Sequence, residues 1–65
     1  MVCIKIDSTK VVDTQGRTYE ITYGVTDTHY HYVSRVELID HGICQIIHGY
    51  DGMELLDCML TIMAQ

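Results

Sequence analysis

The chain has 65 residues, and its 48% hydrophobic and 20% charged content is that of a globular protein, which argues against a disordered chain. Nine acidic against four basic side chains give a formal charge of −5, and this charge argues against direct binding to nucleic acid or to an anionic membrane. We expect a single domain over residues 1–65, whose small core is supplemented by a disulfide, a metal or self-association.

The first half of the chain alternates apolar and polar residues as β-strands do. A first strand is expected over Val2 to Val12 and a second over Arg17 to Val25, with turn residues between them. A third strand is expected from about His29 to Ile39, and a fourth from about Ile43 to His48. Short connections of this kind predict an antiparallel meander of three to four strands.

Asp40-His41-Gly42 reads as a three-residue hairpin loop that ends in a left-handed glycine. Such a loop predicts that Leu38 lies opposite Cys44 and Val36 opposite Ile46. The other face of the two strands would then carry more β-branched residues than solvent needs, and we expect it to be the interface of a homo-oligomer. The predicted interface residues are Val33, Ile39, Ile43, Ile47 and Arg35. The alternative is that these are scattered surface residues of a monomer.

The C-terminal segment predicts one amphipathic helix from about Asp51 to Met63. Asp51 as N-cap and Glu54 three residues later form an acidic capping box. The apolar residues fall within about half a turn of the helical wheel, and Cys58 falls on the polar side. We therefore predict an α+β fold, in which a C-terminal amphipathic helix packs on one face of the antiparallel meander.

The three cysteines, Cys3, Cys44 and Cys58, lie far apart and form no Cys-x-x-Cys pair. Their number and spacing indicate neither a disulfide framework nor a zinc ribbon and favour a reducing compartment. No apolar run approaches the roughly 18 residues of a membrane span, and the N-terminus has no signal-peptide pattern. We expect a cytoplasmic protein.

No catalytic or cofactor motif is evident. His29 and His31 share a strand face, but the sequence supplies no third metal ligand, so we predict neither a metal site nor a cofactor. Neither Cys44 nor Cys58 has a base or an oxyanion donor beside it, and the glycines lack the spacing of a phosphate loop. We predict that the protein is not an enzyme and has no catalytic residue.

Tyrosine is the only aromatic residue type, with five copies, and it suits interfaces because a large rigid surface ends in a hydroxyl. By strand alternation Tyr19, Tyr23, Tyr30 and Tyr32 are expected to share a face, and most of them to pack in the core. Tyrosines near loops can stack on a base, and arginine can bind phosphate with two hydrogen bonds. The candidate ligand-binding residues are Tyr30, Tyr32, Tyr50, Arg17 and Arg35.

In general character, this short and acidic chain of strands and one helix resembles the small proteins with which bacteriophages inhibit host defences, anti-CRISPR proteins among them. The resemblance covers no specific residues and transfers no site; it implies stoichiometric binding instead of turnover. We expect a small non-catalytic homo-oligomeric binding protein that inhibits a host (bacterial defence) protein or complex, with itself and a host protein as partners. Two alternatives are an oligomer that sequesters a nucleotide signal in pockets between protomers, and a metal-binding or structural subunit that uses His29 and His31.

Overall fold

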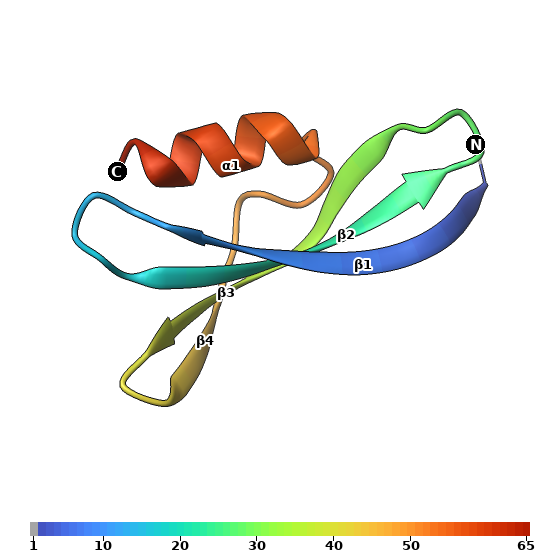
Figure 1. Ribbon diagram of the computed structural model, residues 1–65. Coiled ribbons are helices and arrows are strands. Elements are labelled where there is room, and N and C mark those ends of the chain that lie inside the picture. Colours follow the sequence, from blue (N-terminus) through green and yellow to red (C-terminus); the bar gives the residue numbers. More distant parts are fainter. Residues whose placement is uncertain (1) are drawn as a thin grey trace.

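Residues 2–65 are described by a computed structural model, in which four strands form one antiparallel sheet in the order β1-β2-β3-β4. Figure 1 shows a single helix, α1, lying across one face of this sheet, while the β3–β4 hairpin projects away from the layer. The bounds are Cys3–Val12 for β1, Thr18–Thr26 for β2, His31–Asp40 for β3, Ile43–Ile47 for β4 and Leu55–Met63 for α1. The predicted α+β meander with one C-terminal helix is confirmed.

The core lies between α1 and the sheet. α1 packs against β1 and β3. The buried apolar side chains come from β1, β2, β3 and α1. They are Val11, Tyr19, Ile21, Val33, Val36, Cys58 and Ile62. On β2 the buried residues Tyr19 and Ile21 alternate with Glu20 and Thr22, as a strand with one covered face requires.

A β-bulge in β3 changes which residues face the core. Tyr23 pairs with Val33 and Thr22 pairs with Arg35, so Ser34 is the additional residue. Val33 therefore shares the helix-covered face with Val36 and is only 1% exposed. Its predicted place on an outer interface is wrong, because alternation was counted through Ser34 without a bulge. The same bulge separates Tyr32 from Tyr19 and Tyr23, so the predicted common tyrosine face is not formed.

The β3–β4 hairpin has a two-residue loop, His41-Gly42, and both residues have positive φ, 49° and 80°. This is the pattern of a type I′ turn, whose twist matches that of the flanking strands. Asp40 therefore pairs with Ile43, and the predicted three-residue loop is wrong by one residue.

That shift reverses the two faces of β4 relative to the prediction. Ile47 lies opposite Val36 and packs against the core, whereas Ile39 lies opposite Cys44 on the other face. Ile43 is 71% exposed at the hairpin tip. The predicted set of Val33, Ile39, Ile43 and Ile47 therefore does not form one common outer face, and the interface predicted from that face loses its basis.

α1 begins four residues later than predicted, because the preceding segment pairs with β3. The Gly52 N–H donates to the Val33 carbonyl at 2.8 Å, the Val33 N–H donates to the Met53 carbonyl at 2.8 Å, and Glu54 forms a bridge with Tyr32. Glu54 is the N-cap residue and makes no side-chain capping hydrogen bond. The predicted N-cap at Asp51 is wrong, since Asp51 lies in an exposed turn.

The two sides of the apolar arc of α1 differ in exposure. Cys58 and Ile62 are fully buried against the sheet, so the prediction that Cys58 lies on the polar side is wrong. Leu56 and Leu60 are 56% and 54% exposed, and Met63 one turn further on is 39% exposed. Leu56, Leu60 and Met63 are four and three residues apart and lie along one line of the helix surface, which we call the helix stripe.

Within residues 2–65, no helix has the length and apolar character that crossing a membrane requires.

Candidate functional site

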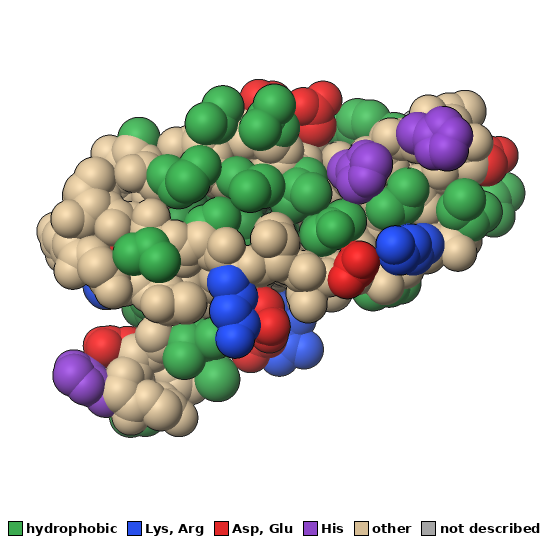
Figure 2. Space-filling model, in the orientation of Figure 1, with side chains coloured by type: hydrophobic (Ala, Val, Ile, Leu, Met, Phe, Trp, Pro, Cys, Tyr) green, Lys and Arg blue, Asp and Glu red, His purple; other side chains and the backbone are tan. Residues whose placement is uncertain are grey.

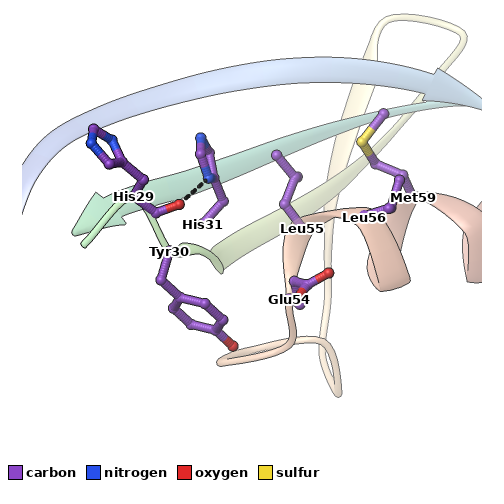
Figure 3. Close-up of a pocket in the computed structure, with 7 residues that line it drawn as sticks. All are labelled: His29, Tyr30, His31, Glu54, Leu55, Leu56 and Met59. Atoms are coloured by element: carbon purple, nitrogen blue, oxygen red, sulfur yellow. Dashed lines mark hydrogen bonds between the residues drawn. The ribbon is translucent and has the colours of Figure 1, made fainter. Parts of the chain in front are cut away.

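A pocket of about 380 Å³ lies where the start of α1 meets the β2–β3 loop (Figure 3). It is lined by His29, Tyr30, His31, Glu54, Leu55, Leu56 and Met59. In Figure 3 the side chains of His31, Leu55 and Met59 point to the same side, whereas Tyr30 points away from them. The lining is therefore aliphatic on the helix wall and imidazole on the loop wall.

Thr26 shapes the loop wall of the pocket. Its backbone N–H donates to the Tyr30 carbonyl at 2.9 Å, and its hydroxyl oxygen accepts from the Tyr30 N–H at 3.1 Å. The His29 N–H donates to the Thr26 carbonyl at 3.0 Å, which closes a tight turn with His29 at a φ of 64°. Thr26 is 3% exposed, so a buried residue holds the exposed His29-Tyr30-His31 segment in place.

The imidazole ring of His31 has two neighbours within the chain. The Nδ1 atom of His31 lies 3.0 Å from the His29 carbonyl oxygen, and its ring packs at 5.7 Å from the ring of Tyr23. In the part of the chain that the structure describes, no three His, Cys, Asp or Glu side chains gather as a metal site would require. Among these described residues, His29 and His31 thus have no third ligand.

The helix stripe continues from the pocket, because Leu56 belongs to both. Figure 2 shows hydrophobic side chains gathered over α1 and over the part of the sheet beside it, with two histidines further along the same face. Glu54 and Asp57 are exposed at the first turn of the helix and give this apolar surface an acidic border.

The three tyrosines predicted to bind a ligand do not meet. Tyr30 lines the pocket, while the ring of Tyr32 lies on the opposite sheet face, so close to Gly24 that a Cβ there would be 2.5 Å from Tyr32 Cζ. A hydrogen bond with the Cys3 side chain raises the pKa of the Tyr32 hydroxyl. The Tyr50 hydroxyl accepts a hydrogen bond from Gln65 Nε2 at 2.7 Å, near the end of α1.

Both candidate arginines are paired with carboxylates away from the pocket. The Arg17 Nε–H donates to Asp13 Oδ2 at 2.8 Å, and the Asp13 side chain, closed to solvent, also accepts from the Gln15 and Arg17 amides and the Tyr19 hydroxyl. Arg35 Nη2 lies 3.4 Å from Glu37 Oε2 on the exposed sheet face. Asp13 is one of the turn residues expected between the first two strands, and an Asp at the start of a turn is well placed to accept backbone N–H groups.

The three thiols are free, and they differ in accessibility. Cys3 and Cys44 are exposed, and Cys58 is buried. Burial raises the pKa of the Cys58 thiol, which keeps it protonated and poorly nucleophilic.

Comparison of the chain with family models, curated proteins and solved structures gives no match. The functional proposal therefore rests on the geometry of this chain. The strongest feature is the pocket together with the helix stripe. The sequence indicated the stripe, but not the pocket. The signal was an apolar arc on α1 wider than the roughly 100° that packing on a core requires.

Proposed function

We propose that the protein is a small non-catalytic, homo-oligomeric binding protein that inhibits a host defence protein or complex by forming a stoichiometric complex with it in the cytoplasm. The observation that carries the proposal is the helix stripe, which leaves Leu56 and Leu60 more than half exposed and runs into an aliphatic pocket. A continuous apolar surface of this kind is typical of a site that a partner covers.

The chemistry of the border indicates what kind of partner surface fits. Glu54 and Asp57 adjoin the apolar surface, and the chain as a whole carries a charge of −5. A complementary partner presents aliphatic or aromatic side chains that enter the pocket and Lys or Arg side chains around them. Opposite charge speeds association and orients the partner, while the apolar contact supplies most of the affinity.

Binding instead of turnover is supported by the state of the strongest potential nucleophile in the core. The Cys58 thiol is fully buried under α1, and its raised pKa disfavours the thiolate. The side chains at the pocket instead form a binding surface with apolar walls and an imidazole edge.

The first experiment identifies the partner and tests where it binds. Wild-type protein, Leu60→Ser and Ile46→Ser are used in parallel for affinity capture from the source cells, and the captured protein is then purified and titrated with each variant. Ile46 is the matched control, because it is also an exposed aliphatic residue, 49% against 54% for Leu60, but lies on β4. We expect Leu60→Ser to weaken binding at least about tenfold, which corresponds to about 1.4 kcal/mol, and Ile46→Ser to leave it unchanged.

The second experiment tests stoichiometry. Titration of the partner's activity should reach full inhibition at a fixed, whole-number ratio of the two chains. Inactivation of many partner molecules by one molecule of this protein would show catalysis and would overturn the proposal. Native mass spectrometry of the purified protein distinguishes the nucleotide-sequestering alternative, because a co-purified nucleotide would appear as a defined mass increase.

A further inference from the structure

The outer edge of β1 is open. Among residues 2–65, β1 pairs with β2 only, so the backbone groups on its other side have no partner strand there. The strand has ten residues. Ile4 and Ile6 in its first half are 61% and 60% exposed, and Val2, just before the strand, is 64% exposed. Soluble proteins usually shorten, bend or cover such an edge, because it is a template for pairing with another strand.

α1 leaves this half of β1 uncovered because the helix is short. Nine helical residues span about 13 Å, whereas ten strand residues span about 33 Å. The C-terminal end of α1 is held at the β1–β2 hairpin, where the Thr14 N–H donates to the Gln65 carbonyl at 2.9 Å (Figure 1). On the face that α1 covers, Val11 is therefore buried, and Lys5 and Asp7 lie beyond the helix. Ile6 alternates with them and lies on the opposite face of the sheet.

The β1–β2 ladder determines which residues of β1 present hydrogen-bonding groups to the open edge. The Asp13 N–H donates to the Arg17 carbonyl at 3.0 Å, and the register is regular from Lys5 to Val12. Between Lys5 and Val12, odd-numbered residues therefore bond to β2, and the N–H and C=O groups of Ile6 and the other even-numbered residues point outward; the register shift between Cys3 and Lys5 ends this pattern. The Ser8 N–H agrees with this direction, since it donates to Asp7 Oδ1 at 2.8 Å instead of joining the ladder.

Charge selects one register for pairing β1 with a second copy of itself. In a continuous antiparallel sheet, the two-fold axis that relates two such edges is perpendicular to the sheet, so it passes midway between the two copies of one residue. An axis between the two copies of Ile6 places Lys5 of each copy opposite Asp7 of the other, within the regular part of β1. Ile6 then lies opposite Ile6, in a pair that exchanges both backbone hydrogen bonds because its groups point outward.

Neighbouring registers are less favourable. An axis at Lys5, Asp7 or Lys10 places two like charges directly opposite each other, which is destabilising. An axis at Ser8 or Thr9 leaves the Asp7 carboxylate opposite an uncharged residue. Within one chain Lys5 Nζ already lies 3.4 Å from Asp7 Oδ2, so the Ile6 register joins two such pairs into a neutral cluster of four charges.

We propose that two copies of the chain join through the open edges of β1, antiparallel and centred on Ile6, to form a continuous eight-stranded sheet. The inference rests on the homo-oligomeric part of the proposed function and specifies its interface. Because the axis is perpendicular to the sheet, both copies of α1 lie on the same face. The two helix stripes therefore point in one direction, and the dimer presents a bivalent surface to its partner.

Charge exchange tests the register without touching the core. In Lys5→Asp and, separately, in Asp7→Lys, every Lys5–Asp7 contact across the axis becomes a like-charge contact. Each variant should dimerise at least about tenfold more weakly in analytical ultracentrifugation, about 1.4 kcal/mol. A mixture of the two variants should recover wild-type affinity as a heterodimer, because both contacts then join opposite charges. Lys10→Asp is the matched control, since it makes the same change of charge on β1 at a residue outside the Lys5–Asp7 contacts, and its dimer should be unchanged.

Amide hydrogen exchange supplies a second readout. In the dimer the Ile6 amide should exchange slowly, and in Lys5→Asp it should exchange rapidly, while the Asp7 and Thr9 amides stay protected by β2 in both. A dimer that all three variants retain would overturn the inference but leave the homo-oligomeric proposal standing. A wild-type chain that is monomeric at millimolar concentration would overturn both, whereas the partner titration with Leu60→Ser would still report on binding to the host protein.

Discussion

The two ends of β1 differ although they belong to one strand. On the face of β1 that α1 covers, Val11 is 6% exposed, whereas the side chains of Lys5 and Asp7, nearer the start of the strand, are 64% and 48% exposed. The molecule extends 36 Å along its longest axis, and one short helix cannot cover that length. The covered end holds the core that stabilises the fold, and the open end together with the helix stripe holds the surfaces available for binding. In so small a domain, the buried residues that stabilise the fold and the exposed residues available for binding are thus neighbours on the same elements.

The largest expected change in stability comes from a comparison of two residues of α1, one buried and one exposed. Ile62→Ala removes a fully buried side chain and should lower the free energy of unfolding by about 2–5 kcal/mol. Leu60→Ala, two residues away on the exposed side, should cost less than about 1 kcal/mol. Urea unfolding of both variants measures the difference. Since Ile62→Ala is expected to approach the whole stability of the domain, Ile62→Val, with a cost of about 0.5–1.5 kcal/mol, keeps the comparison measurable. Equal costs at the two positions would contradict this distinction between buried and exposed residues.

Cysteine reactivity sharpens the same comparison, because the chain has thiols in both regions. Cys3 and Cys44 should react with a thiol reagent in the folded protein, and Cys58, whose burial raises its pKa, should react only after unfolding. Cys58→Ser places a hydroxyl in an apolar site and should cost about 1–3 kcal/mol. Cys44→Ser is the control and should be close to neutral. Rapid modification of all three thiols under native conditions would show that α1 does not stay closed over the sheet.

The sequence predicted the fold class and the strand positions to within about two residues, because alternation and turn residues are local signals. It did not predict registers or faces. One bulge at Ser34 and one residue fewer in the β3–β4 loop were enough to move Val33 and Ile47 from the predicted outer face to the core side. Side chains alternate with a period of two, so a single miscounted residue reverses every assignment beyond it.

Local sequence patterns also did not predict the start of α1 or the pocket. Asp51 and Glu54 match a capping box, but residues 52–54 pair instead with residues 32–33 of β3, about 20 positions away in the sequence. The pocket brings His29 and His31 against Leu55 and Met59, and nothing near either segment in the sequence indicates that contact. Only the width of the apolar arc on α1 signalled that one of its sides would remain open.

Acid sensitivity is expected to arise at the covered end, where Asp13 is closed to solvent. Burial by itself raises the pKa of this carboxyl, but hydrogen bonds from Arg17, Gln15 and Tyr19 together outweigh it and hold the pKa below the usual 3.8. Since the folded pKa is lowered, the stabilisation is fully present above pH 3.8 and is lost as the pH falls through the lowered value.

Asp13→Asn should therefore be less stable than wild type at neutral pH, and the gap should narrow as the pH falls. The amide would direct an N–H group toward the Arg17 Nε–H and leave it without an acceptor. Asp51→Asn, in an exposed turn, is the control and should follow the wild-type curve at every pH. Urea unfolding between pH 7 and pH 2.5 checks this expectation. A gap that stays constant with pH would exclude the ionised carboxylate as the cause.

The smallest expected effect lies at the projecting hairpin, where His41 has a φ of 49° and Gly42 a φ of 80°. Asn tolerates the left-handed region better than other non-glycine residues, and Asn-Gly is the preferred pair in type I′ turns. His41→Asn should therefore raise stability by about 0.5 kcal/mol, while the β-branched substitution His41→Val should lower it by about 1 kcal/mol. The ion pair between His41 Nε2 and Asp40 Oδ1, 3.4 Å apart, is well exposed, so its loss adds little in either variant.

If the loop had three residues built on a type I turn, His41 would have negative φ and His41→Val would be nearly neutral. Denaturant unfolding of the two variants thus tests the register that turns Ile47 toward the core, and cross-strand nuclear Overhauser contacts between Asp40 and Ile43 provide the direct check.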